Sequence, residues 1–263
     1  MSLTHLTDRA LLLVEGEEAE HFLEGLVTSE LPVDGIAQGS ALLTPQGKLL
    51  FSFLISRHGA GFALECDASD VEALAKRLTL YKLRAKVTIT PSELVVFAGQ
   101  GGALTDARHV AMPKRSYATA DDTDGHGIEY ATQRAKLGVL EGPTEIIPNQ
   151  DFPHDVALDL TGAVSFSKGC FVGQEVVSRV KHRGTARRRP VLISGEGIQA
   201  EQPIMVGERE VGTVRMAQDG LGIAVVRLDH LKGPATVDGH AVSLAAPPYA
   251  TYSLEPETSA DPI

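Results

Sequence analysis

The chain has 263 residues, of which 43% are hydrophobic and 22% charged, and its formal net charge is −10. This composition is typical of a globular protein that is long enough for two or three small domains. No stretch approaches the roughly 18 consecutive apolar residues of a membrane helix, and the N-terminus lacks the basic region of a signal peptide. We therefore expect a cytoplasmic protein that does not engage membranes.

Positive charge is concentrated in two acid-free segments of this acidic chain. Residues 179–189 contain six basic side chains, and residues 73–92 contain five. General DNA binding favours a broad basic surface, so we do not expect it here. Local patches fit a small anionic ligand or an acidic partner, although each could also be a solvated face. A third reading is RNA association, with the arginines at 187–189 contacting phosphates.

The first hundred residues predict short strands alternating with helices. The predicted strands are residues 9–14, 40–43, 48–56, 62–66, 82–90 and 94–98. Helices are predicted over residues 17–26 and from Ser69, where Ser69 and Glu72 form a capping box. Pro45 and Gly47 predict a type I turn between the second and third strands. Residues 36–98 therefore form a small α+β unit.

The sequence pattern changes after residue 189, from a loop and a helix to short strands. Residues 114–127 are polar and predict a loop, and residues 129–137 predict a helix ended by a glycine. From Arg189 onward, short strands divided by regular turn signals predict a small antiparallel β-barrel or β-sandwich. Residues 251–263 are expected to be a disordered tail.

One stretch, residues 163–184, stands apart from the rest. It predicts a strand with Val164 and Phe166 on one face, then a glycine-flanked turn holding Cys170, then a helix over residues 173–181. A helix N-terminus and cationic neighbours both stabilise a thiolate, so we expect a reactive or ligating thiol at Cys170. The alternative is a small buried residue that fills a tight turn.

Two cysteines cannot build a disulfide framework or a four-cysteine metal site within one chain. Cys66 ends an apolar strand and is interpreted as structural. The nine histidines show no spacing typical of zinc ligands, so no bound metal is predicted. Gly99 to Gly102 lack the third glycine of a dinucleotide-binding fingerprint.

The octapeptide Lys168-Gly-Cys-Phe-Val-Gly-Gln-Glu175 resembles the signature of the YgfZ family. These are tetrahydrofolate-binding proteins related to the glycine-cleavage aminomethyltransferase, and they include iron–sulfur assembly factors. Residues 14–25, the Thr44-Pro-Gln-Gly-Lys48 turn and residues 189–229 extend the resemblance over nearly the whole chain.

The resemblance implies an α+β fold of three small domains in a cloverleaf around a central channel that accommodates folate. A folate-binding-like domain would comprise residues 1–35 and 99–185, a ferredoxin-like unit residues 36–98, and the barrel residues 186–250. We accordingly expect an accessory factor, rather than a conventional enzyme, for assembly or repair of [4Fe-4S] proteins, including tRNA-modifying radical enzymes. Its partners would be an assembly scaffold or client proteins, and the chain itself is expected to be a monomer.

The functional thiol implied by the resemblance is Cys170. Its motif neighbours are Lys168, Gly169, Gly173, Gln174 and Glu175. Because one chain cannot supply four cysteines, any cluster must be shared with another molecule. The thiol would be a transient cluster ligand, a group acting on a partner's cluster, or a redox group beside the folate.

Ligand binding is predicted at four further residues. Bacterial relatives place two tryptophans in the folate site, and Arg9 and Tyr130 occupy those positions here. Tyr130 can stack on a pterin, and the Arg9 guanidinium can stack or bind the glutamate tail. Arg179 and Lys181 add positive charge for an anionic ligand.

The alternative function is a folate-dependent aminomethyltransferase-type one-carbon transfer. Such an enzyme needs a positioned carboxylate to handle the substrate amine, and no motif in this sequence locates one.

Overall fold

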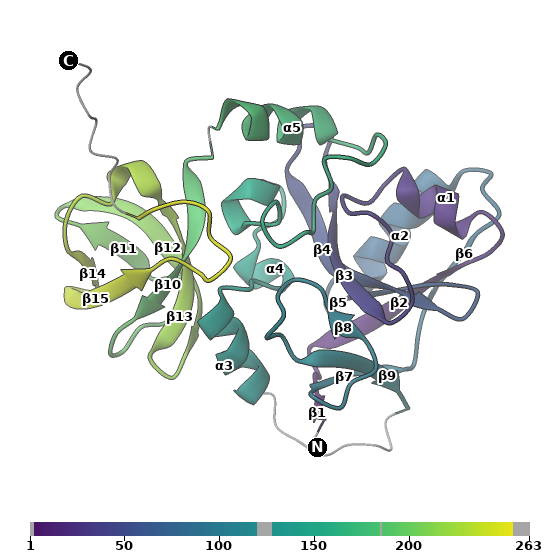
Figure 1. The fold of residues 1–263 in the computed structure, drawn as a ribbon, viewed down its shortest axis with the longest axis horizontal. Coiled ribbons are helices and arrows are strands. Elements are labelled where there is room, and N and C mark those ends of the chain that lie inside the picture. The colour runs from purple at the N-terminus through teal and green to yellow at the C-terminus, as the bar shows by residue number, and fades with distance from the viewer. Residues whose placement is uncertain (1–2, 120–127, 185, 255–263) are drawn as a thin grey trace.

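The computed structural model describes residues 3–119, 128–184 and 186–254. A β-barrel lies at one end of the molecule, two sheets lie at the other, and helices lie between them (Figure 1). The α+β class predicted from the sequence is confirmed.

The larger sheet has six strands in the order β6-β2-β5-β4-β3-β8. Their bounds are β2 Arg9–Glu15, β3 Ile36–Leu43, β4 Leu49–His58, β5 Gly61–Asp67, β6 Thr88–Pro91 and β8 Thr105–Asp106. Helices α1 (Ala19–Glu24) and α2 (Val71–Lys82) pack on it through an apolar cluster that includes Phe22 and Leu74. The predicted division between residues 35 and 36 runs through this sheet, because β2 pairs with β5 and β6; the division itself stays a prediction.

The β3–β4 hairpin closes with the expected turn. The Gly47 amide donates to the Thr44 carbonyl, and the Thr44 amide donates to the Lys48 carbonyl, both at 2.8 Å. Leu43 and Leu49 are buried on either side, in a second apolar cluster that also holds Val177, Met216 and other residues of the helices and the barrel. The hairpin is therefore packed into the centre of the molecule.

The smaller sheet corrects one prediction. Its three strands are β1 (Thr4–His5), β7 (Val95–Gly99) and β9 (Lys114–Ala118), and β9 occupies the start of the predicted 114–127 loop. The sequence of β9 is polar because its inward side chain, Arg115, is fully buried against carboxylates. Residues 120–127 lie outside the described residues.

Helices α3 (Ile128–Leu137), α4 (Gly142–Glu145) and α5 (Gln174–Arg183), with the 3₁₀ helix η1 (Pro153–Val156), connect the sheets to the barrel. The predicted helices at 129–137 and 173–181 are confirmed as α3 and α5. In Figure 1, α5 lies across the hairpin end of β3 and β4, whereas α3 lies at the opposite side of the molecule.

The C-terminal strands form a closed barrel, which is one of the two forms expected from the strand and turn pattern and the one that the family resemblance implied. Its strands follow the order β10-β13-β12-β11-β14-β15. Their bounds are β10 Arg188–Ser194, β11 Pro203–Val206, β12 Arg209–Gln218, β13 Leu221–Arg227, β14 Ala235–Val237 and β15 His240–Ala245. A second 3₁₀ helix, η2 (Leu228–His230), follows β13.

The beginning of the predicted disordered tail is in fact placed on the barrel. The Tyr252 hydroxyl donates to the Pro190 carbonyl at 2.5 Å, and Leu254 packs against the barrel core. Tyr252 and Leu254 supply apolar surface for this packing, which the composition of the whole tail does not indicate. Residues 255–263 lie outside the described residues.

Three local predictions in the sheets and helices were wrong. The capping box does not form, because α2 begins at Val71 and the Ser69 hydroxyl donates to Asp67 instead. Residues 82–87 belong to the end of α2 and a turn, so the strand predicted over 82–90 is confined to β6. The stretch around Val164 is irregular, because the hydroxyl of Ser165 accepts hydrogen bonds from nearby amides in place of a strand ladder.

Within the described part of the chain, no helix has the length and apolar character needed to cross a membrane.

Candidate functional site

Cys170 is exposed, in an open cleft at the start of α5. The cleft has a volume of about 530 Å³. Its lining residues are Pro45, Cys170, Phe171, Val172, Gly173, Gln174, Glu175 and Ser178. The β3–β4 turn thus forms one wall and the first turns of α5 another, and the two motifs singled out in the sequence meet here.

The cysteine turn and the hairpin turn are in direct backbone contact. Gly173 has a φ of +83°, and a methyl group on it would lie 2.6 Å from the Thr44 carbonyl oxygen. A methyl group on Gly47 would lie 2.9 Å from the Cβ of Val176. Glycine is needed at both positions because the conformation and the close approach exclude a side chain.

Lys168 ties the cysteine turn to the segment after α1. Its ammonium donates to the carbonyls of Val27 and Ser29 at 2.6 and 2.9 Å. Burial lowers the pKa of Lys168, while Glu24 and Glu30 act in the opposite direction. The ammonium also lies 5.6 Å from the ring centroid of Phe171. Lys168 therefore anchors the cysteine turn, and its ammonium group is already bound by carbonyl groups of the protein.

The same segment holds the turn at further points. The Glu30 carboxylate accepts hydrogen bonds from Ser165 and Ser167 at 2.7 and 3.3 Å. The fully buried Thr28 hydroxyl donates to the Ala163 carbonyl at 2.7 Å. Sequence reasoning missed residues 27–30 as a support, since short hydroxyl residues after a helix look like an ordinary turn.

The remaining predicted residues of this region lie along α5. Glu175 and Arg179 form the expected exposed pair at 2.6 Å. The ammonium of Lys181 lies 3.6 Å from the ring centroid of Phe166. Arg179 and Lys181 are thus on the surface of α5, on the opposite side of the molecule from the helix that carries Tyr130 (Figure 1).

Arg9 and Tyr130 lie in the interior, in a buried ion-pair network. Arg9 donates to the carboxylate of Glu65 at 3.2 Å and to its carbonyl at 3.0 Å. The Tyr130 hydroxyl donates to Glu141 at 2.5 Å and accepts from Arg115. Both predicted ligand-binding residues therefore have their polar groups paired within the protein.

The network is electrically balanced. It contains four buried arginines and four buried carboxylates: Arg9, Arg108, Arg115, Arg134, Glu65, Asp106, Glu141 and Glu145. Burial alone would raise the pKa of Glu141, but the surrounding guanidinium groups, Arg108 foremost, hold it well below its usual value. No surplus positive charge remains for the carboxylates of a bound ligand.

The central cavity does not fit a folate in this structure. Arg9, Arg108 and Glu141 line it, and its volume of about 20 Å³ holds roughly one water molecule. The one carboxylate in its lining, Glu141, is held by Arg108 at 2.6 Å and is therefore not free to handle the substrate amine of an aminomethyltransferase.

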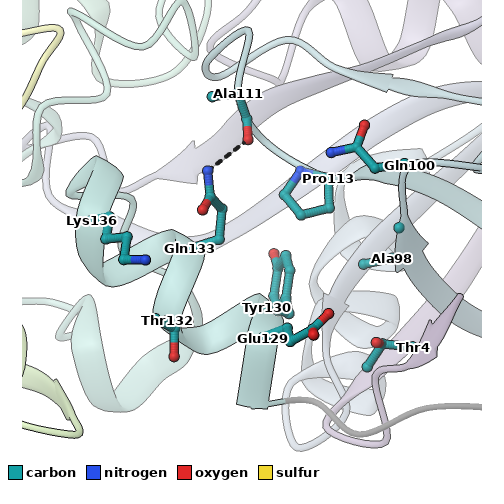
Figure 2. A pocket seen from close by; sticks show the side chains of 11 residues that line it. Thr4, Ala98, Gln100, Ala111, Pro113, Glu129, Tyr130, Thr132, Gln133 and Lys136 are labelled. Carbon is teal, nitrogen blue, oxygen red and sulfur yellow. Dashed lines mark hydrogen bonds between the residues drawn. The ribbon is translucent and has the colours of Figure 1, made fainter. Parts of the chain in front are cut away.

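A larger cavity of about 810 Å³ lies beside α3 and β7 (Figure 2). Tyr130 lines it, and the Gln133 amide across it donates to the Ala111 carbonyl at 3.0 Å. Arg9 does not line it. Neither cavity therefore brings Arg9 and Tyr130 to one ligand.

A resident metal site has no counterpart among the described residues, where no group of three or more histidine, cysteine, aspartate or glutamate side chains is arranged to hold an ion. Cys66 is buried in the core of the larger sheet, and burial raises its pKa to about 12. Cys170 is thus the one cysteine of this chain that other molecules can reach.

Comparisons with solved structures show the fold. The chain is similar to the glycine cleavage system aminomethyltransferase T of Bartonella henselae, with a TM-score of 0.76 and 17% identity, over 94% of this chain and 86% of that one. The family model of the CAF17 C-terminal β-barrel domain matches residues 186–252, which coincide with the closed barrel.

Comparisons with curated proteins show the family. The chain is 31% identical to the mouse iron–sulfur cluster assembly factor IBA57, over 92% of this chain and 82% of the mouse protein. It is 30% identical to the human protein of the same name, with the same coverage.

Both relatives are mitochondrial by name, which contradicts our expectation of a cytoplasmic protein. Composition and hydropathy, on which that expectation was based, do not separate the cytoplasm from the interior of an organelle. The fold, the barrel and the identity over nearly the whole length together show that this chain belongs to the IBA57 family of iron–sulfur cluster assembly factors.

Proposed function

We propose that this protein is an accessory factor for the assembly or repair of [4Fe-4S] proteins, and that it acts through the thiol of Cys170. The observation that carries the proposal is an exposed cysteine on a turn anchored to two other segments, in a chain akin to assembly factors. The resemblance of residues 168–175 to the YgfZ signature supports the same assignment.

The number of accessible cysteines limits how the thiol can contact a cluster. Thiolates bind iron, and a [4Fe-4S] cluster takes four of them. The chain offers Cys170 alone, because the thiol of Cys66 is buried and its pKa is raised to about 12. We infer that Cys170 contacts a cluster whose other ligands belong to a scaffold or client protein.

The position of the thiol favours a protein-bound cluster over a folate as its substrate. Cys170 lines the open cleft, and the cleft and the central cavity share no lining residue. A thiol at an open surface is accessible to another protein, whereas a redox group beside a folate would have to face the central cavity. Clients of this kind include aconitase and the radical enzymes that methylthiolate tRNA.

The proposal is tested by complementation in a strain that lacks the gene. Wild type, Cys170→Ser, Cys66→Ala and Ser178→Ala are returned separately, and aconitase activity and the tRNA methylthiolation product are measured. Ser178 lines the same cleft, so its substitution is the matched control. We expect rescue by every version except Cys170→Ser. Rescue by Cys170→Ser at equal protein levels would contradict the thiol role, and a deletion without effect on these products would contradict the assembly role.

A further inference from the structure

A second cleft lies where the C-terminal end of α5 meets β10 and η1, and the proposed function does not use it. Its volume is about 360 Å³. The lining residues are Gln150, Phe152, His154, Asp155, Val180, Ala186, Arg187, Arg188 and Arg227. Three arginines from two segments that are distant in the sequence, Arg187 with Arg188 and Arg227, therefore line one small cleft.

These arginines leave positive charge available in the cleft. No described residue pairs with the guanidinium of Arg187, which is exposed. Arg188 lies 3.5 Å from Asp151, but Asp151 is already bound by Arg215 at 3.0 Å. The guanidinium of Arg187 is thus unpaired among the described residues, and that of Arg188 lies at a long distance, 3.5 Å, from a carboxylate that it shares with Arg215.

The carboxylates near the cleft do not cancel this charge. Asp155 is the one acidic residue in the lining, and burial raises its pKa. It lies 3.6 Å from Arg188. Arg227 is paired with Asp229 at 3.0 Å, outside the lining. A locally positive cleft in a protein of net charge −10 points to an anion.

His154 supplies a second and independent observation. Its side chain is only 2% exposed and lines the cleft, yet among the described residues neither ring nitrogen has a hydrogen-bond partner. The nearest carboxylate, Asp159, is 4.0 Å away and is held by Arg189 at 2.7 Å. Buried polar nitrogens are nearly always satisfied in native proteins, so this imidazole lacks a partner that solvent or a ligand must provide.

We propose that this cleft binds a small molecule through a phosphoryl group. Arginine guanidinium groups match the geometry of phosphate oxygens, and the N–H of a neutral imidazole can donate to a third oxygen. Phe152 and Val180 give the cleft apolar surface, so the organic part of the ligand can contact the protein beside the phosphoryl group. This site is separate from Cys170, which lines the other cleft.

The test uses the full-length protein and defined probes. Calorimetric titrations with inorganic phosphate and with phenyl phosphate are run at constant ionic strength. The variants are Arg187→Gln and His154→Phe, and Arg179→Gln is the control, because it removes the same charge from an exposed position of α5 outside the lining. The ¹⁵N signals of the His154 ring are followed by NMR in parallel, so the result does not depend on the folding of the His154 variant.

We expect saturable binding of one phosphate per chain and a change in the His154 ring signals. Losing one charge-assisted contact should weaken binding about tenfold in Arg187→Gln and in His154→Phe, against less than about twofold in Arg179→Gln. Tighter binding of phenyl phosphate identifies an organic phosphate as the ligand, and equal affinities identify free phosphate. The proposal is overturned by the absence of saturation, by equal weakening in the control, or by salt-sensitive RNA binding without phosphate binding.

Discussion

Gly173, at the start of α5, lies against Gly47 of the β3–β4 turn, with 3.0 Å between the Gly47 Cα and a methyl group placed on Gly173. This contact joins the segment that carries Cys170 to the hairpin of the larger sheet. It also explains why two glycine-containing motifs from opposite halves of the chain belong to one site. The thiol therefore lies at the surface, on a turn that is held by a close backbone contact.

Gly173→Ala should destabilise the protein and displace the thiol turn. The alanine would be strained at a φ of +83° and would meet the Thr44 carbonyl at 2.6 Å. We expect a loss of about 1–3 kcal/mol in the free energy of unfolding, measured with urea. Gly169→Ala is the matched control in the same motif, because nothing lies within 4 Å of a methyl group there. Equal stabilities of the two variants would show that the contact does not constrain the turn.

The two cysteines should differ sharply in reactivity. Iodoacetamide at pH 8 is expected to modify Cys170, which is exposed, and to leave Cys66 unmodified, because burial raises the pKa of that thiol to about 12. Mass spectrometry should find one adduct on the native protein and two after denaturation. A native Cys170→Ser variant that still took up one adduct would contradict the assignment.

The buried ion-pair network should make Glu141 essential for stability. Glu141→Gln removes a negative charge that balances the positive charges of Arg108, Arg115 and Arg134. Breaking a buried pair from one side costs about 3–5 kcal/mol, so the midpoint of urea unfolding should fall markedly. Glu20→Gln is the control.

Glu20 forms an exposed pair with Arg57 at 3.3 Å, and loss of such a pair changes stability by less than about 1 kcal/mol. Comparable losses in Glu141→Gln and Glu20→Gln would mean that water reaches the interior network.

Stability should fall on acidification through His154. Burial lowers the pKa of His154, and Arg189 and Lys181 lower it further against the opposing effect of Asp159. The unfolded state therefore binds more protons as the pH falls from about 6.5 towards the folded-state pKa, and stability decreases in that window. The slope is at most about 1.4 kcal/mol per pH unit for one proton.

The measurement is urea unfolding at several pH values between 7.5 and 5. His154→Phe removes the titrating group, so its stability should decline less over the same interval. Parallel declines in wild type and His154→Phe would assign the acid sensitivity to other groups.

Patterns that are local in the sequence predicted the structure well. The helices predicted over residues 129–137 and 173–181 matched α3 and α5, and the strands predicted for a barrel or a sandwich form a closed barrel. The glycine-flanked turn before α5 was also located correctly, and Cys170 proved exposed rather than buried.

Features that depend on distant partners were missed or misread. The polar sequence of β9 predicted a loop, because its strand character depends on Arg115 meeting Glu65 from another sheet. Polarity at Ser165 was overlooked as a strand breaker, since its partner Glu30 is far away in the sequence. The pairing of Arg9 and Tyr130 with carboxylates could not be read from spacing either.

The central claim, that the protein acts through Cys170, is tested most directly by activating apo-aconitase with a cluster-loaded scaffold protein in the presence of this chain. The native protein is first alkylated, which modifies Cys170 and spares Cys66, and is compared with untreated protein and with Cys66→Ala. We predict that untreated protein and Cys66→Ala accelerate activation, whereas alkylated protein and Cys170→Ser leave it at the rate of the scaffold alone. Equal acceleration by the alkylated and untreated proteins would contradict the account.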